Sequence, residues 1–336
     1  MTEVYRQIID HPAAWTNESL GGAGPLKVRM TESQLKALEE LIAKSKSLAP
    51  QEITRKDWDH PAINGFLREQ FDEIQNGKGA VIIQGMARDR FSDEDMERVY
   101  WGFGTHWGVA ATQSAFGDKL GQVKNTPVGP ENPTGRAYRS DDELKPHTDS
   151  FEIVGLLCLQ KAPEGGYSQL VSSLAIHNVM LKTRPDLLEA LYRGFPYATS
   201  EAAKTDEPIT PGPVPVFAQV DGVVSGRFVR NHMRRAAKHL GTPIPADLEE
   251  AMDYFEALST RPDLTLHFLI EPGEMLLFNN FTTLHARENF KESPTQKRHL
   301  LRMWLDVPNG RKAIPAYDWQ AQGYKKAGAK KLQATA

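Results

Sequence analysis

Short apolar runs of strand length, rather than long amphipathic stretches, dominate the chain from residue 80 to residue 307. Helical periodicity, in which apolar residues recur three and four positions apart, clusters early in the chain and in one later insertion. Strands that do not alternate regularly with helices argue against a series of β-α-β units. The pattern therefore predicts an α+β protein whose strands form a barrel or a sandwich.

Capping and turn signals divide this pattern into elements. Thr31 and Gln34 have the spacing of a capping box, Ser92 is a predicted N-cap, and Asp221-Gly222 is a strong hairpin signal. The predicted helices cover about residues 31–47, 63–75, 92–101, 172–183, 184–191, 232–240 and 247–258. The predicted strands cover about residues 80–85, 120–126, 151–159, 168–171, 215–220, 223–229, 264–270, 275–278 and 300–307.

Composition limits the classes of function. The chain has 336 residues, a net charge of −3 and 40% hydrophobic residues, so we expect neither a nucleic acid nor an anionic membrane as its partner. The one cysteine, Cys158, excludes an internal disulfide framework and a thiolate-rich metal site, and its apolar surroundings predict a small core residue.

Location is predicted from what the sequence lacks. Residues 1–10 are polar and mixed in charge, unlike a secretory signal, and no apolar run approaches bilayer-spanning length. We therefore expect a cytoplasmic protein without a membrane partner, and assembly into a homo-oligomer is left open.

Three residues form a candidate metal site. His147 and Asp149 lie two positions apart before an apolar run, where side chains of a strand would point to the same side, and His285 comes much later. A single His-x-Asp pair is weak evidence by itself, because about one such pair is expected by chance in a chain with ten histidines. Two imidazoles and a carboxylate suit a non-haem Fe(II) oxygenase, but a zinc hydrolase could use the same three ligands.

Two arginines favour the oxygenase. Arg298 and Arg302 are four residues apart in an otherwise apolar segment, so they share a side in either a strand or a helix. Buried cations require an anion, and the planar guanidinium suits a carboxylate. A dicarboxylate co-substrate beside the metal would satisfy both; the alternative is a solvated strand face with ordinary salt bridges.

Substrate contacts are predicted in a loop and a hairpin. The loop over residues 127–146 carries Arg136, Tyr138 and Arg139, and the hairpin strand ends at Arg230. These side chains could bind an anionic small molecule. A loop this long is often a binding loop, but a disordered surface excursion is an equal alternative, and each side chain alone is more often a surface residue.

Other histidines receive structural interpretations. His106 lies between bulky aromatics and is predicted to be packed, whereas His232 and His239 are predicted to be solvated. The glycines of residues 101–108 look like a dinucleotide-binding loop. Their spacing differs from that motif and a predicted helix, not a strand, precedes them, so we exclude a dinucleotide site here.

Taken together and in order, these motifs resemble the taurine dioxygenase / clavaminate synthase-like family of Fe(II)- and 2-oxoglutarate-dependent oxygenases. The similarity extends from about residue 79 to residue 307. It rests on His147-Thr148-Asp149, the turn Gly165-Gly166-Tyr167-Ser168, Asn279-Asn280-x-x-x-Leu284-His285-x-Arg287 and Arg298-x-x-x-Arg302.

The resemblance implies roles for six residues. His147, Asp149 and His285 match the iron ligands, and Asp149 argues against the halogenating variants. Arg298 matches the arginine that pairs with the far carboxylate of 2-oxoglutarate, and Ser168 takes the place of a hydroxyl residue that bonds the same carboxylate. Arg302 matches an arginine that contacts either the near end of 2-oxoglutarate or an anionic substrate group.

The resemblance also implies a fold and an activity. We expect one dioxygenase domain over residues 1–336, with a double-stranded β-helix (jelly-roll) core over about 79–307, flanked by helices. An N-terminal helical region over 1–78 and a basic tail over 320–336 complete it. Using Fe(II), 2-oxoglutarate and O2, it would oxidise, most simply hydroxylate, a C–H bond of a small metabolite, giving succinate and CO2. The alternatives are a zinc- or manganese-dependent hydrolase or isomerase on a cupin-like barrel, and a non-catalytic jelly-roll binding protein.

Overall fold

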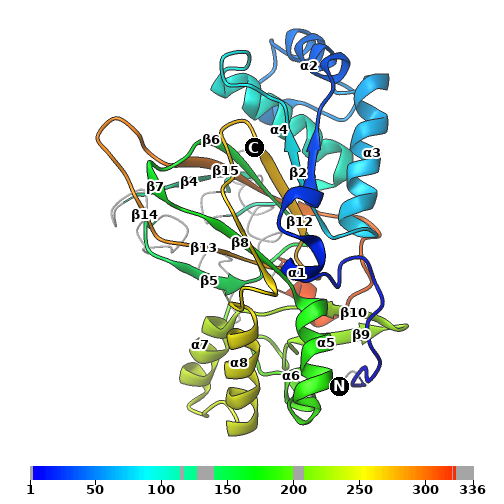
Figure 1. Cartoon of the computed structure of the whole chain (residues 1–336), viewed down its shortest axis with the longest axis vertical. Coiled ribbons are helices and arrows are strands. Elements are labelled where there is room, and N and C mark those ends of the chain that lie inside the picture. The colour runs from blue at the N-terminus through cyan, green and yellow to red at the C-terminus, as the bar shows by residue number, and fades with distance from the viewer. Residues whose placement is uncertain (1–2, 114–116, 127–139, 200–207, 320, 323–336) are drawn as a thin grey trace.

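Two groups of helices enclose a central pair of sheets (Figure 1). The structure is a computed structural model that describes residues 3–113, 117–126, 140–199, 208–319 and 321–322. One group, α2 to α4, lies at one end of the long axis, and the other, α5 to α8 with a small hairpin, lies at the opposite end (Figure 1). Mixed helices and sheets agree with the predicted α+β class.

The N-terminal helices begin where the capping signals predict. Thr31 and Gln34 form a reciprocal capping box, and Ser92 caps the fourth helix through Asp95. The elements are α1 (Asn17–Leu20), η1 (Gly24–Leu26), β1 (Lys27–Arg29), α2 (Glu32–Lys44), η2 (Pro50–Glu52), α3 (Pro61–Gln75), β2 (Ala80–Gln84) and α4 (Asp93–Trp107).

Helix α4 continues past residue 101, where the sequence predicts its end. Its glycines sit at close contacts: a Cβ on Gly102 would lie 2.1 Å from Trp58, and one on Gly104 would lie 2.5 Å from Met303. These glycines let the helix pack tightly, so the 101–108 segment is a packing surface.

The larger sheet contains seven strands within the described residues, in the order β1-β2-β12-β6-β15-β3, with β4 also paired to β15. All of its pairings are antiparallel except β1 with β2. Its further members are β3 (Val109–Ala110), β4 (Leu120–Lys124), β6 (Ile153–Gln160), β12 (Met275–Asn279) and β15 (His299–Asp306).

The smaller sheet, with the order β11-β8-β13-β5, is antiparallel throughout. Its strands are β5 (Leu144–His147), β8 (Ser168–Ser172), β11 (Thr265–Phe268) and β13 (Thr283–Arg287), and β7 (Glu164–Gly165) pairs separately with β14 (Phe290–Lys291). Leu170 and Leu266 of this sheet share an apolar core with Val154, Cys158 and Leu276 of the larger sheet. The two sheets therefore pack against each other, and Cys158 is a buried core residue as predicted.

Two strands of the smaller sheet contradict the sequence prediction. Residues 144–146 were predicted to belong to a loop but form β5 together with His147, and residues 283–287 were not predicted as a strand but form β13. Both are short and mix polar with apolar side chains, so neither shows a strand pattern on its own. Their pairing partners in the sheet fix them instead.

The second group of helices follows the prediction more closely. Ser172 caps α5 (Ser173–Thr183), followed by η4 (Pro185–Leu187), α6 (Leu188–Arg193), α7 (Arg230–Leu240) and α8 (Ala246–Leu258). The hairpin of β9 (Phe217–Val220) and β10 (Val223–Gly226) turns at Asp221 and Gly222, both with positive φ. No helix within the described ranges is long and apolar enough to cross a membrane.

Candidate active site

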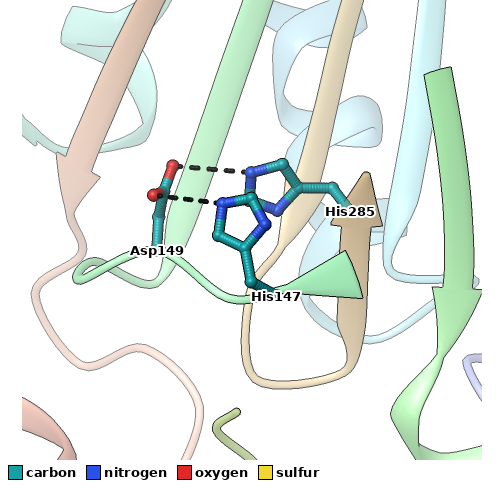
Figure 2. Close-up of side chains that lie close together, drawn as sticks. All are labelled: His147, Asp149 and His285. Carbon is teal, nitrogen blue, oxygen red and sulfur yellow. Dashed lines mark ion pairs between the residues drawn. The ribbon is translucent and has the colours of Figure 1, made fainter. Parts of the chain in front are cut away.

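The three predicted ligands meet at the end of the smaller sheet (Figure 2). His285 of β13 pairs directly with His147, the last residue of β5. Asp149 lies beyond the end of β5, in the connection to β6, so the two ligands do not share one strand as the sequence suggested. The turn after β5 brings the carboxylate back toward both imidazoles.

The donor atoms are close enough to share one metal ion. Nε2 of His147 lies 3.9 Å from Oδ1 of Asp149, and Nε2 of His285 lies 3.6 Å from Oδ2 (Figure 2). All the ligand atoms lie within 4.8 Å of one another. Two imidazole nitrogens and one carboxylate are the ligand set of non-haem Fe(II) oxygenases, so the residues present fit an Fe(II) ion.

Hydrogen bonds orient the His-Thr-Asp segment. Nδ1 of His147 lies 2.8 Å from the carbonyl oxygen of Lys145, which directs the lone pair of Nε2 toward the ligand group when Nδ1 carries the proton. The backbone N–H of Thr148 donates to the Phe228 carbonyl at 3.0 Å, and the N–H of Phe228 donates to Oγ1 of Thr148 at 3.1 Å. The segment is thus tied to the connection between β10 and α7.

Charge at the site favours the protonation states that a metal needs. Burial alone would raise the pKa of Asp149. The positive charge of Arg302, the imidazoles of His285 and His147 and a hydrogen bond from Trp304 outweigh the effect of burial and lower this pKa to about 2. Burial, His147 and Arg302 lower the pKa of His285 to about 3, against the opposing effect of Asp149. At neutral pH the site therefore holds a carboxylate and a neutral imidazole, which is the form that binds a metal ion.

A pocket beside His285 is lined by a buried arginine. It is lined by His285, Ser168, Arg298 and Arg302, and otherwise mainly by apolar side chains that include Leu156, Leu170 and Leu276. Arg298 is 5% exposed, and its Nη1 makes no hydrogen bond to any described residue. Burial and the nearby Arg287 lower the pKa of Arg298 to about 10, so it remains a cation at neutral pH. A buried cation of this kind suits an incoming carboxylate.

Comparison with known proteins identifies the family to which the chain belongs. The model of the family described as "Taurine catabolism dioxygenase TauD, TfdA family" matches residues 44–304. The chain belongs to this family. FR-33289 synthase of Streptomyces rubellomurinus is 27% identical over 329 residues, covering 93% of this chain and 94% of the synthase. The taurine hydroxylase-like protein SAT17 of Stachybotrys chartarum is 27% identical and covers 86% of this chain and 77% of that protein.

Solved structures share the fold. Asparagine oxygenase, in complex with Fe(II), hydroxyasparagine and succinate, superposes with a TM-score of 0.65 at 17% identity, covering 83% of this chain and 93% of the other. The non-haem iron oxygenase OrfP, in complex with Fe and α-ketoglutaric acid, gives 0.63 at 13% identity, covering 84% and 94%. As a member of the family, the protein is an Fe(II)- and 2-oxoglutarate-dependent dioxygenase that acts on a small-molecule substrate. The sequence-based prediction of the activity and its cofactors is confirmed.

Two residues at the site were not predicted from the sequence. Gln113, which is 1% exposed, accepts a hydrogen bond from Nε of Arg302 at 2.7 Å and donates one to the backbone oxygen of Arg302 at 2.8 Å. Trp304 donates its indole N–H to Oδ2 of Asp149 at 2.8 Å. Trp304 shares the predicted strand face with Arg302, and that alternation was the available signal. Gln113 carried no comparable signal.

The predicted position of Arg230 at the end of a hairpin strand is wrong, and its contact with the substrate stays a prediction. Arg230 is not at the end of a strand but is the first residue of α7, where it is 8% exposed and pairs with three carboxylates of α8. These partners are Glu249, Asp253 and Glu256. Arg230 therefore joins two helices. Arg136, Tyr138 and Arg139 lie outside the described residues.

The histidine predictions are partly confirmed. His106 is half-buried with Nε2 2.9 Å from the Trp58 carbonyl oxygen, so it is packed as predicted, and His239 is exposed as predicted. The prediction that His232 is solvated is wrong. Its Nδ1 lies 2.5 Å from the carbonyl oxygen of Ala198, its ring stacks on Tyr197, and burial lowers its pKa to about 4.

Proposed function

We propose that His147, Asp149 and His285 hold the Fe(II) of this dioxygenase, and that the adjoining pocket receives 2-oxoglutarate. The proposal rests on one observation: the candidate metal ligands adjoin a pocket that contains a buried arginine. His285, one of the three converging ligands, lines a pocket that the buried guanidinium of Arg298 also lines, and Nη1 of Arg298 has no hydrogen-bond partner among the described residues. Burial of such a cation is costly unless an anion pairs with it.

Each pocket residue has a proposed task. Arg298 and the hydroxyl of Ser168 bind the far carboxylate of 2-oxoglutarate, which fixes the length of acid that fits. Arg302 lies between Asp149 and Gln113 and lines the same pocket, which favours contact with the near end of 2-oxoglutarate over contact with the substrate. The apolar side chains exclude water around the chain of the diacid.

Bound Fe(II) and 2-oxoglutarate supply the O2 activation of this family, with succinate and CO2 as products. The contribution of the chain is to hold Asp149 ionised and His285 neutral, to orient the diacid between Arg298 and the metal, and to keep stray water away. The substrate C–H bond must then be placed beside the metal. We propose hydroxylation of a small molecule as the outcome.

The fold supports the same assignment. We propose that the two packed sheets are the halves of a double-stranded β-helix, because both histidine ligands come from the smaller sheet and the arginines come from the β15 segment of the larger one. Four expectations stay predictions: a single domain over residues 1–336, a cytoplasmic location, the absence of a nucleic-acid partner and the oligomeric state.

An anaerobic titration with Fe(II) and then 2-oxoglutarate tests the proposal. We expect a weak visible charge-transfer band for the intact protein, and loss of this band in His147→Ala and Asp149→Ala. His239→Ala, which changes an exposed histidine of α7, is the matched control and should keep the band. A band that persists in either ligand variant would show that the metal is held elsewhere.

A further inference from the structure

Asp149 is the one proposed ligand that lies outside a strand, so the sheet does not fix its carboxylate. Its orientation comes from the larger sheet instead. Trp304 of β15 donates its indole N–H to Oδ2 at 2.8 Å, and Nη1 of Arg302 lies 3.5 Å from the same oxygen. Oδ1 faces Nε2 of His147 at 3.9 Å, and Oδ2 also faces Nε2 of His285 at 3.6 Å (Figure 2). Each oxygen of Asp149 thus faces one imidazole, and Oδ2 in addition accepts the indole N–H of Trp304.

The indole itself is firmly placed. Trp304 is 4% exposed and lies within β15, opposite Val154 of β6, while its backbone oxygen accepts the N–H of Ala111 at 2.9 Å. Its ring lies 5.8 Å from that of Phe151, and the guanidinium of Arg302 lies 4.4 Å from the ring centroid. Because these contacts hold both its backbone and its ring in place, Trp304 can fix the rotation of the Asp149 carboxylate.

We infer that Trp304 is a positioning residue of the iron site, one whose indole N–H engages Oδ2 of Asp149, fixes the rotation of the carboxylate and so keeps Oδ2 from becoming a second metal ligand beside Oδ1. The inference rests on the proposed iron site. Its chemical purpose is to keep coordination positions open. A carboxylate that turned freely could offer both oxygens to the ion and fill a position that the facial arrangement of two histidines and one carboxylate leaves open for other ligands.

Trp304 is better suited to this task than Arg302. The indole contact is the shorter of the two, at 2.8 Å against 3.5 Å, and falls within hydrogen-bonding distance. Arg302 also faces the pocket that we assign to 2-oxoglutarate. If Arg302 turns toward the diacid, the indole N–H still holds Asp149, so the ligand keeps its orientation before and after the co-substrate binds.

Two substitutions separate the N–H from the ring. Trp304→Phe keeps an aromatic ring between Phe151 and Arg302 but has no donor. Trp304→His keeps a ring N–H at the equivalent position from Cβ, but lacks the benzene ring. Binding of Mn(II) without 2-oxoglutarate is measured at pH 8 from the loss of the electron paramagnetic resonance signal of the free ion, with the thermal midpoint of each apoprotein recorded in parallel.

We expect Trp304→Phe to raise the Kd for Mn(II) by about 10- to 100-fold, the usual effect of removing a group that orients a metal ligand. Trp304→His should bind Mn(II) closer to the intact protein despite a lower thermal midpoint. Trp101→Phe is the control: it deletes an indole N–H that donates to the Ile53 carbonyl at 3.0 Å in the helical region, and should leave the Kd unchanged.

The outcomes are distinct. Wild-type affinity in Trp304→Phe would overturn the inference, and so would Kd values that merely follow the thermal midpoints of the two variants. An intact protein that takes up no Mn(II) would overturn the iron site itself, and this inference with it.

Discussion

Replacing Arg298 by methionine should weaken 2-oxoglutarate binding while leaving the apoprotein at least as stable. Methionine keeps an apolar stem in the pocket but removes the guanidinium, whose Nη1 has no hydrogen-bond partner among the described residues. The hydrogen bond from the backbone N–H of Arg298 to Glu292, at 2.8 Å, is retained. The side chain thus contributes little to the apo structure and much to the complex.

The size of the effect follows from the burial of Arg298. Truncating one partner of a buried, hydrogen-bonded charge pair costs about 2–5 kcal/mol. Arg287 lies near enough to lower the pKa of Arg298 and would still attract the carboxylate, so we expect the lower part of that range. At about 1.4 kcal/mol for each tenfold change, the Kd for 2-oxoglutarate should rise roughly 30- to 300-fold. Because the cost of burying this cation outweighs the attraction of Glu292, as its lowered pKa indicates, removing it should leave the thermal midpoint unchanged or raise it.

The assay is an anaerobic titration of the Fe(II)-loaded protein with 2-oxoglutarate, together with thermal unfolding of the apoprotein. Arg298→Lys, which keeps the charge but not the planar fork, should give an intermediate Kd. Arg98→Met is the matched control, because the buried guanidinium of Arg98 donates to the carbonyls of Ser45 and Leu48. It should lower the thermal midpoint without changing the Kd. An unchanged Kd in Arg298→Met would refute the assignment of the co-substrate pocket.

Two further predictions test the helical region. Arg230→Ala leaves three carboxylates of α8 without their shared cation and should destabilise the protein by about 2–3 kcal/mol in chemical denaturation; a changed substrate KM with unchanged stability would instead favour Arg230 as a substrate contact. Burial lowers the pKa of His177 to about 4. Below pH 6.5 the unfolded chain binds a proton that the folded protein does not, so stability should fall by about 1.4 kcal/mol per pH unit between pH 6.5 and 4 because of this residue. Across that range, the denaturant midpoint of His177→Gln should depend less steeply on pH than that of the wild-type protein. The control His239→Gln, which changes an exposed histidine, should keep the wild-type dependence. Equal slopes in the wild type and both variants would contradict a lowered pKa for His177.

Local signals predicted the parts of the fold that depend on neighbouring residues. The capping boxes at Thr31 and Ser92 and the turn at Asp221-Gly222 each act within a few residues, so the sequence reveals them directly. The ligands and the arginine pair were found because metal and carboxylate chemistry restricts which residue types can serve. The resemblance to the family, whose motifs occur here in the same order, then gave each of these residues an expected role.

Long-range pairing explains what the sequence did not reveal. Strands β5 and β13 are fixed by their neighbours in the sheet, and neither has a strong strand pattern of its own. Arg230 looked like a surface cation because its three partners lie on another helix. The contact of Trp304 with Asp149 depends on how β15 packs beside the turn after β5, which no local pattern contains.

The central claim is that three side chains distant in sequence hold one iron ion. Anomalous diffraction at the iron edge, from crystals loaded anaerobically with Fe(II), measures this directly. We predict a single strong peak within coordination distance of Nε2 of His147, Nε2 of His285 and a carboxylate oxygen of Asp149. A peak that lies away from His285, or iron bound only by other residues, would contradict it.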